Sequence, residues 1–212
     1  MQKIDFKKTL KTYWQAPAGE FVIVDTPSLP FLMVDGEGDP NTSTQYAEAV
    51  EALFSLSYKL KFLSKAAGRD YVVPPLQGLW WADKMEDFQR REKDNWSWTM
   101  MIMQPDWITS ALLSDAIAQV RAKGQVIPAT LRLEWFVEGL CVQTLHIGSY
   151  DDEASTIRKL HAEFLPANGL IENGKHHEIY LSDPRRTAPK KLKTILRQPV
   201  RALKPGEKTN WH

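Results

Sequence analysis

The feature that most constrains the fold is a long amphipathic helix, predicted from Thr44 to about Ala67. Its apolar face follows the i, i+3, i+4 spacing of an α-helix and consists of Tyr46, Ala49, Val50, Leu53, Phe54, Ser57 and Leu60. Turn and capping residues precede the helix, and Gly68 is suited to end it. A helix of this length must bury its apolar face, and the extended segments around it indicate that it covers a β-sheet.

Short extended segments flank this helix and recur after it. The predicted strands are 21–25, 30–38, 71–83, 96–105, 130–137, 140–148 and 176–183, and two further helices are predicted at 106–123 and 152–168. Pro27 and Pro30 oppose pairing between the first two strands, whereas 130–137 and 140–148 are predicted to form a hairpin. A short basic helix is expected within 187–200. The order indicates an α+β fold with an antiparallel sheet, helices on one face and the other face available for another role.

The charge balance limits the partners that composition alone would suggest. The 212 residues carry 27 Lys and Arg and 26 Asp and Glu, so the net charge of +1 gives no general attraction to nucleic acid or membranes. From Arg185 onward, nine basic residues and one acid give 9 − 1 = +8, which leaves 18 − 25 = −7 for the rest. A solvated basic tail is the simpler interpretation, since the tail lacks the interleaved aromatic residues of a single-strand binder. Contact with nucleic acid or an acidic partner is the alternative.

Several protein classes are excluded by simple counts. One cysteine, Cys141, excludes a disulfide framework and a multi-thiolate zinc site, and it is expected to be an inert buried thiol. No apolar stretch spans a bilayer, and the N-terminus is too charged for a secretory signal, so a cytoplasmic protein is expected. His176 and His177 point to opposite faces of a strand and make a poor chelate. No metal and no cofactor are therefore expected.

Tryptophan is the most unusual element of the composition. Six of the eight tryptophans lie in the middle of the chain: Trp80, Trp81, Trp96, Trp98, Trp107 and Trp135. Strand alternation sends Trp80 and Trp81 to opposite faces, and it sends Trp96 and Trp98 to the same face. A large aromatic core explains this pattern, and so does an aromatic-walled pocket for a flat or cationic small molecule. Nearby methionines, including Met101, suit an adaptable ligand surface or simple filling of the core.

Two acids lie among apolar strand residues. Glu178 and Tyr180 alternate with Ile179, so they are expected to project together from the face opposite the core. Glu134 is similarly placed between Leu133 and Trp135. A carboxylate that faces an aromatic pocket would hold a cationic ligand or act as a general base toward water. The alternative for both acids is a solvated glutamate on an open sheet face.

An ordered set of strings resembles the stand-alone GyrI-like small-molecule-binding family. The strings are FLMVDGEGDPN (31–41), the helix with Tyr46 and Leu53, PPLQGLWW (74–81), MIMQPDW (101–107), EGLCVQTLHIGSYDDE (138–153) and HHEIYLSDPRRTAPKKLKTILRQPV (176–200). They extend from about residue 20 to residue 200. The resemblance implies duplicated βαββ modules related by a pseudo-two-fold axis, with the ligand cleft between them on the helix-free face.

The resemblance also implies a ligand class and site residues. The wider family binds hydrophobic, often cationic compounds with aromatic walls and an inward glutamate, which corresponds here to Glu178. The strings are similar to those of cyclopropanoid cyclopropyl hydrolases, which open the cyclopropane of DNA-alkylating compounds of the yatakemycin and duocarmycin type. The aromatic cage would consist of Tyr71, Trp80, Trp81, Trp98 and Trp135. Gln77 stands where that subfamily implies a glutamate, which puts an acid-assisted step at that position in doubt.

Three functions follow as hypotheses. The first is a hydrolase that detoxifies flat electrophilic compounds, with Glu178 as general base, Tyr71 or Tyr180 as the phenol, and Trp80, Trp81, Trp98, Trp135, Glu134 and Met101 around the ligand. The second is a non-catalytic module that binds or sequesters such compounds. The third is a protein-interaction role, such as shielding a topoisomerase, which rests only on the charge distribution. The expected organisation is a lead-in at 1–19, one domain at 20–200 with pseudo-repeats near 20–105 and 128–184, and a basic tail at 201–212.

Overall fold

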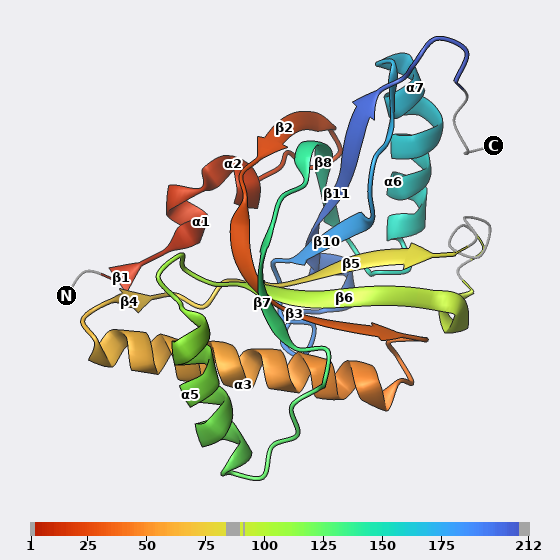
Figure 1. Ribbon diagram of the computed structural model, residues 1–212. Coiled ribbons are helices and arrows are strands. Elements are labelled where there is room, and N and C mark those ends of the chain that lie inside the picture. Colours follow the sequence, from red (N-terminus) through yellow and green to blue (C-terminus); the bar gives the residue numbers. More distant parts are fainter. Residues whose placement is uncertain (1–2, 84–89, 91, 208–212) are drawn as a thin grey trace. The chain divides into compact units, whose positions relative to one another are not determined.

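The chain folds into two compact units, and each unit consists of two separate segments of the sequence. The computed structural model describes residues 3–83, 90 and 92–207 (Figure 1). Unit 1 consists of Met1–Lys11 and Ser28–Phe136, and unit 2 consists of Thr12–Pro27 and Val137–His212. Each unit combines an antiparallel sheet with helices, as expected for an α+β fold. No helix among the described residues is long and apolar enough to cross a membrane.

Unit 1 is built on a four-stranded antiparallel sheet with the order β5-β6-β3-β7. Its strands are β3 (Leu29–Glu37), β5 (Leu76–Ala82), β6 (Trp96–Met103) and β7 (Arg132–Phe136). The unit also contains α1 (Phe6–Thr9), the 3-10 helix η1 (Lys93–Asn95) and a short parallel pair of β1 (Lys3–Ile4) with β4 (Asp70–Tyr71).

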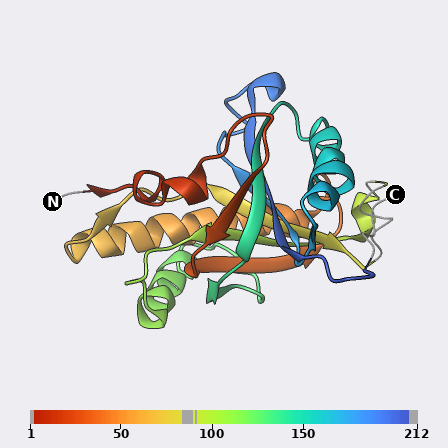
Figure 2. The same cartoon turned by 90° about the horizontal axis from the view of Figure 1, so that it is seen from above.

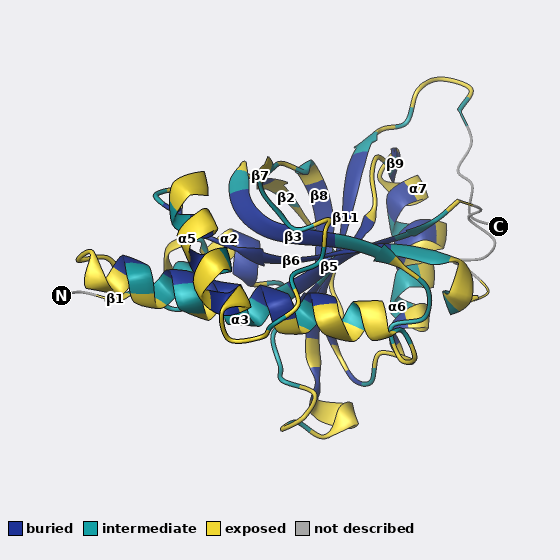
Figure 3. Cartoon of the chain, turned by 60° about the horizontal axis from the view of Figure 1, so that its bottom comes forward, coloured by how far each residue is buried: buried dark blue, intermediate teal, exposed yellow. Residues whose placement is uncertain are grey.

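The predicted long helix is present as α3 (Thr44–Ala66), and it packs on α5 (Ser110–Arg121) and on the sheet of unit 1. Ser43 caps α3 by accepting a hydrogen bond from the amide of Tyr46, and Gly68 follows its end with a φ of +92°. The buried stripe of α3 comprises Ala49, Ala52, Leu53, Leu56, Ser57, Leu60 and Ser64. Figure 3 shows this stripe in dark blue against the exposed outer side of the helix.

Unit 2 has an antiparallel sheet with the order β2-β8-β11-β10, and β9 pairs with the end of β11. Its strands are β2 (Val22–Thr26), β8 (Gly139–Ile147), β9 (Leu170–Glu172), β10 (His176–Tyr180) and β11 (Lys193–Ala202). The prediction of a basic helix within 187–200 was wrong, because only the 3-10 turn η3 (Pro189–Lys191) is helical there and the strand β11 follows it. Arg201 at the end of β11 pairs with Glu207, so the expected tail is partly structured; its residues 208–212 lie outside the described part.

Strand pairing differs from the sequence prediction at one hairpin. The segments 130–137 and 140–148 were expected to pair with each other, but β7 pairs with β3, and β8 pairs with β2 and β11. The prediction was wrong because the short turn at 137–138 joins two strands that belong to different units. The absence of a β2–β3 hairpin was predicted correctly, since β2 pairs with β8 and β3 with β6 and β7.

The helix of unit 2 contains a π turn. It runs as α6 (Glu153–Lys159), the π-helical turn η2 (Leu160–Phe164) and α7 (Leu165–Ala167), and Gly169 follows with a φ of +64°. Pro166 has no N–H for the carbonyl four residues earlier, so an α-helix cannot continue regularly past it. The segment packs on Val142 and Val200 through Leu160 and Leu165, and Figures 1 and 2 show it beside β10 and β11.

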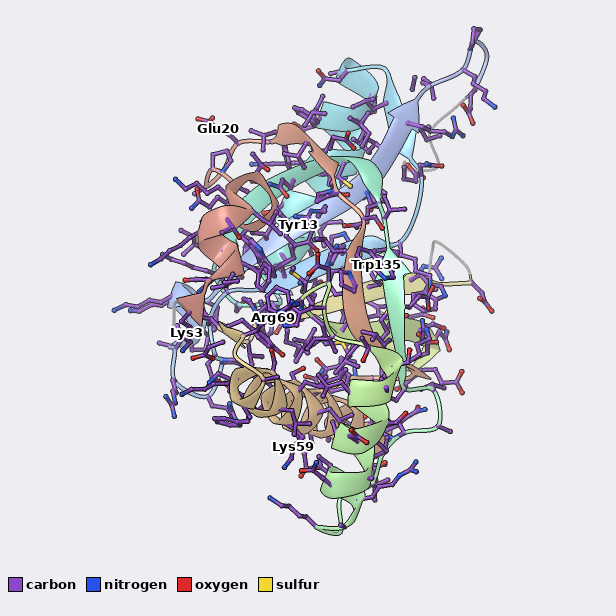
Figure 4. The ribbon with its side chains drawn as sticks, turned by 60° about the vertical axis from the view of Figure 1, so that its left-hand side comes forward. Lys3, Tyr13, Glu20, Lys59, Arg69 and Trp135 are labelled. Atoms are coloured by element: carbon purple, nitrogen blue, oxygen red, sulfur yellow. The ribbon has the colours of Figure 1, made fainter. Side chains whose placement is uncertain are left out.

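The N-terminal segment is more deeply embedded than the expected peripheral lead-in. Helix α2 (Lys11–Trp14) buries Tyr13 and Trp14, and the Tyr13 ring lies over the guanidinium of Arg197 (Tyr13 is labelled in Figure 4). Gln143 donates to the carbonyls of Thr12 and Gln15. Arg197 and Gln143 lie directly opposite each other on the sheet, so this segment covers the face of unit 2 that lacks the helix.

Candidate functional site

Strand register divides the predicted aromatic cage between the two faces of the sheet of unit 1. Trp80 lies opposite Trp98, and both rings contact Tyr46 of α3 at centroid distances of 6.1 and 5.3 Å. These two tryptophans therefore lie on the helix-bearing face, which is the face on which the helix of the same unit packs. Trp81 alternates with Trp80 and lies on the opposite, helix-free face. The predicted divergence of Trp80 and Trp81 is confirmed.

The helix-bearing face of unit 1 carries a compact aromatic cluster, which we define as Tyr46, Trp80, Trp96 and Trp98. Trp98 is fully buried, and Trp80 meets Trp96 edge-on at 5.8 Å. Gly36 lies opposite Trp98 on β3, and a Cβ at Gly36 would overlap the indole ring. Because Gly36 has no side chain, the Trp98 ring packs directly against the backbone of β3.

The helix-free face of unit 1 holds the remaining members of the predicted set that lie on β5 and β6. Met101 is fully buried and lies opposite Gln77, which is also fully buried. Trp81 projects from the same face and is partly exposed. The position where the resemblance implies a glutamate is thus on the face opposite Trp80 and Trp98.

Tyr71 and Trp135 occupy contrasting environments in unit 1. Tyr71 is fully buried on β4, donates a hydrogen bond to Oε1 of Gln104 at 3.1 Å, and meets Phe6 and Trp107 edge-on. Burial raises the pKa of its hydroxyl well above the ordinary value of 10. Trp135 pairs with Pro30 at the edge strand β7 and is 58% exposed (Figure 4).

Glu134 is held in an ion-pair network on the helix-free face of unit 1. Its Oε2 lies 2.6 Å from Nε of Arg132, and the same guanidinium donates to both carboxylate oxygens of Asp35 at 2.8 and 3.2 Å. Thr99 donates to Asp35 as well, at 2.7 Å. The charge of Glu134 is therefore compensated by its own strand, which leaves less of it available to a ligand.

Glu178 and Tyr180 project together from β10, as predicted. The hydroxyl of Tyr180 donates to Oε2 of Glu178 at 2.8 Å, and Nε2 of His176 lies 3.6 Å from the other carboxylate oxygen. The side chain of Glu178 is 14% exposed and that of His176 is 3% exposed. A phenol, a carboxylate and an imidazole on alternate residues of one strand form an acid–base constellation with limited access to solvent.

These groups lie on the helix-bearing face of unit 2, whereas the helix-free face was expected. Tyr180 lies opposite Thr194, and Thr194 lies opposite His146, whose Nδ1 is 3.3 Å from the hydroxyl of Thr156 on α6. The expectation was wrong because the opposite face, which carries Ile179, is the one covered by the segment with Tyr13. The helix and the predicted acid therefore share a face.

Sequence reasoning missed the polar neighbours of Glu178. The strand period of two would have placed His176 beside it, but the adjacent His176 and His177 were considered only as a chelate. Tyr150, whose ring meets Tyr180 edge-on at 5.8 Å, comes from a loop before α6 and leaves no periodic signal. Burial, with Glu153 and Glu178 nearby, raises the pKa of Tyr150 to about 12.

Comparisons with known proteins are consistent with this architecture. An uncharacterized conserved protein from Listeria innocua is 40% identical, with a TM-score of 0.85, and the match covers 94% of this chain and 100% of that chain. Two structures of a hydrolase from Listeria innocua match with the same identity and coverage and TM-scores of 0.81 and 0.84. The C-terminal domain of EcmrR, at 11% identity and a TM-score of 0.57 over 87% of this chain and 98% of that chain, shares the fold. Among curated proteins, none matches this chain.

The family assignment rests on a match over most of the chain. The sequence profile of the GyrI-like small molecule binding domain matches residues 19–201. The match spans parts of both units, from three residues before β2 to the penultimate residue of β11. The chain therefore belongs to the family of GyrI-like small-molecule-binding domains.

Proposed function

We propose that this protein is a cytoplasmic hydrolase that opens the cyclopropane ring of flat, DNA-alkylating cyclopropanoid compounds and so protects the cell. The observation that carries the proposal is the carboxylate of Glu178, held by the Tyr180 hydroxyl at 2.8 Å and by His176 at 3.6 Å, with 14% of its side chain exposed. The 40% identical Listeria innocua structures described as a hydrolase support a hydrolytic activity. The family supports a small-molecule ligand.

The proposed reaction adds one water to the drug. Glu178 takes a proton from the water as its oxygen bonds to the unsubstituted cyclopropyl carbon, and the strained carbon–carbon bond breaks. The bonding electrons move through the conjugated ring to the carbonyl oxygen, which becomes a phenolate and then takes up a proton. In the product this carbon carries a hydroxyl group and is no longer electrophilic toward DNA.

The two candidate phenols fit different roles in this reaction. Tyr180 already donates to Glu178, so we assign it to orienting the carboxylate. Tyr71 donates to Gln104 inside unit 1, and its raised pKa keeps it protonated, as a donor to a phenolate must be. Stabilisation of the phenolate by Tyr71 would require exchange of its bond to Gln104 for one to the drug.

The aromatic residues of unit 1 supply the apolar surface that a flat ligand needs. Trp80 and Trp98 are buried beneath α3, so we assign them, with the fully buried Met101, to supporting the strands. We propose that the partly exposed Trp81 on the helix-free face and the exposed Trp135 of β7 supply the aromatic surface for the drug. Glu134, neutralised by Arg132, is assigned the lesser role of setting the charge near β7.

Mass spectrometry of a cyclopropanoid compound after incubation with the purified protein tests this proposal. The wild type is expected to add one water, whereas Glu178→Gln is expected to slow turnover by roughly 10²–10⁴-fold and still bind the drug. Glu134→Gln is the matched control, since its carboxylate is paired with Arg132, and its turnover should stay near that of the wild type. Unchanged turnover in Glu178→Gln would refute the assigned base.

A non-catalytic binding module is the second candidate function. Gln77, buried where the resemblance implies a glutamate, favours it because an amide cannot serve as a general base. Intact drug together with quenched tryptophan fluorescence would support sequestration without chemistry. In that outcome a Gln77→Glu variant that gains turnover would assign the loss of activity to this position.

A further inference from the structure

Tyr150 lies beside the Glu178 constellation and is joined to it through Tyr180. It belongs to the loop between β8 and α6, and its ring meets the Tyr180 ring edge-on, with centroids 5.8 Å apart and planes at 78°. The hydroxyl of Tyr180 in turn donates to Oε2 of Glu178 at 2.8 Å. Two direct contacts therefore connect Tyr150 to the proposed base, and all three residues belong to unit 2.

The loop that carries Tyr150 is fixed on both sides of this residue. The amide of Gly148 donates to the carbonyl of Leu192 at 3.0 Å. The amide and the hydroxyl of Ser149 both donate to Oδ2 of Asp152, at 3.2 and 2.7 Å. A side chain on a loop held in this way has a defined position before a ligand arrives, which suits a donor that must meet a developing charge.

Two hydroxyl groups in this region have no hydrogen-bond partner among the described residues. One is the hydroxyl of Tyr150, a residue that is 36% exposed and so open to a ligand. The other is the buried hydroxyl of Thr194, which lies directly opposite Tyr180 on β11. Because buried hydroxyls are nearly always hydrogen-bonded, the hydroxyl of Thr194 indicates that a polar group of a ligand completes this part of the site.

The hydroxyl of Tyr150 stays protonated at neutral pH. Partial burial, and then the charges of Glu153, Glu178 and Asp183, raise its pKa to about 12. A protonated phenol is a hydrogen-bond donor, as the stabilisation of an oxyanion requires. The same three carboxylates oppose a further negative charge nearby, so a phenolate formed here depends on a direct donor.

The other two candidate phenols are less well placed for this role. Tyr180 already donates to Glu178, and Tyr71 is fully buried in unit 1, where it donates to Gln104. Tyr150 combines an exposed ring with a hydroxyl that is not already engaged. In the proposed substrate the reacting carbon and the carbonyl oxygen lie at opposite ends of one six-membered ring, so the base and the donor must be separate residues.

We propose that Tyr150 is the catalytic phenol that donates a hydrogen bond to the carbonyl oxygen of the drug as this oxygen becomes a phenolate. The inference rests on the proposed hydrolase function and gives Tyr150 the role that the sequence suggested for Tyr71 or Tyr180. The water oxygen bonds to the cyclopropyl carbon, the water proton goes to Glu178, and the electrons of the broken carbon–carbon bond move to the oxygen that Tyr150 holds. Tyr150 keeps its own proton. The phenolate then takes one proton from solvent and Glu178 releases one, so the net reaction adds one water.

The first test uses the reaction product and does not depend on turnover. The ring-opened phenol, prepared by chemical hydrolysis of the drug, is bound to the protein and titrated by its phenolate absorbance. In the wild type, the pKa of the bound phenol should lie about one to two units below its value in Tyr150→Phe, because a hydrogen bond from Tyr150 favours the phenolate. Equal values, or a phenol that does not bind to the wild type, would overturn the assignment.

The second test is turnover. Tyr150→Phe retains the ring that contacts Tyr180 and should lower kcat by roughly 10²-fold with little change in KM, since the donor acts in the transition state. Tyr58→Phe, which alters another exposed tyrosine on α3, is the matched control and should leave kcat unchanged.

The outcomes separate this inference from the function on which it rests. Product formation by Tyr150→Phe at the wild-type rate overturns the role of Tyr150 and leaves the hydrolase function intact. An absence of product from the wild type refutes the hydrolase function instead. The titration of the bound phenol then decides whether Tyr150 is a donor to a phenolate.

Discussion

The two units use one element order for two kinds of surface. In each, a long strand, a helix and two further strands form a βαββ sequence, and one extra strand, β7 or β2, completes the sheet. The helix-bearing face of unit 1 is lined by the aromatic cluster beneath an uninterrupted helix of 23 residues. The same face of unit 2 carries Glu172, His176, Glu178 and Tyr180 beneath a helix with a π turn.

This difference shows what a duplicated scaffold leaves variable. The backbone sets which residues point toward the helix, and the side chains at those positions decide between apolar recognition and acid–base chemistry. All four histidines of the described residues, at 146, 161, 176 and 177, belong to unit 2. We therefore expect substitutions in the two units to have different effects.

The largest effect is expected from Arg197→Ala in unit 2. The guanidinium is fully buried and donates to Oε2 of Glu138 at 3.1 Å and to the carbonyl of Tyr13 at 2.6 Å. Removing one partner of a buried ion pair costs about 3–5 kcal/mol, because the other charge stays buried. Urea denaturation measures this loss. Arg185→Ala, whose exposed side chain pairs with Asp183, is the control and should leave the denaturation midpoint close to that of the wild type.

A smaller loss is expected from Gly36→Ala in unit 1. The new Cβ would overlap the Trp98 ring, and overpacking of this kind costs about 1–3 kcal/mol. Gly78→Ala is the comparison, since its Cβ would meet Nε1 of Trp80 at the less severe distance of 2.7 Å. The double variant Gly36→Ala/Trp98→Phe should cost less than the sum of its parts in the same denaturation experiment. If the losses of unfolding free energy from the two substitutions were strictly additive, the packing of the Trp98 ring would not depend on Gly36.

Acid should weaken unit 2 and spare unit 1. Burial lowers the pKa of His161 and of His177 below the ordinary 6.5, so the unfolded chain binds these protons more readily than the folded chain. The unfolding free energy then falls as the pH drops below about 6.5, by at most about 1.4 kcal/mol per pH unit for each ring. Hydrogen exchange should show earlier loss of protection in β8 and β11 than in β3 and β6. Equal losses in both units would contradict this assignment.

The smallest effect is expected at the start of α3. Ser43→Ala removes the side-chain cap on the amide of Tyr46 and should cost about 0.5–1 kcal/mol. Ser55→Ala, in the middle of the same helix, is the control and should stabilise slightly because alanine has the higher helix propensity. The helix of unit 2 has no such dependence on Asp152, whose side chain makes no cap hydrogen bond and instead accepts from Ser149. Thermal unfolding of the variants measures the difference.

Local patterns predicted the local structure well. The periodicity of 44–67 gave α3, and alternation correctly placed Trp80 against Trp81 and Glu178 beside Tyr180. Alternation separates two faces but carries no information about which face receives the helix, and for that reason Glu178 was assigned to the wrong side. The false hairpin at 130–148 has the same origin, since strand pairing depends on distant partners.

Structural features that depend on contacts between distant segments could not be predicted from the local sequence pattern. The embedded segment with Tyr13 lies before residue 19, where the family match begins, and its burial depends on Arg197 far along the chain. His161 reached the sheet through a π turn, while the sequence indicated a regular helix over 152–168. Pro166 was the available clue, because a proline inside a helical pattern signals a local change of hydrogen bonding.

The interleaving of the two units has a consequence for synthesis on the ribosome. Thr26 of β2 donates to the carbonyl of Gly139, 113 residues later in the chain. At about 5–20 residues per second, β2 leaves the exit tunnel on the order of 10 s before its partner β8. The strands of unit 1 from β3 to β7 all emerge in that interval. Unit 1 can therefore form while β2 still lacks its partner strand, β8. The sheet of unit 2 is therefore completed only after its last strand, β11, has been made.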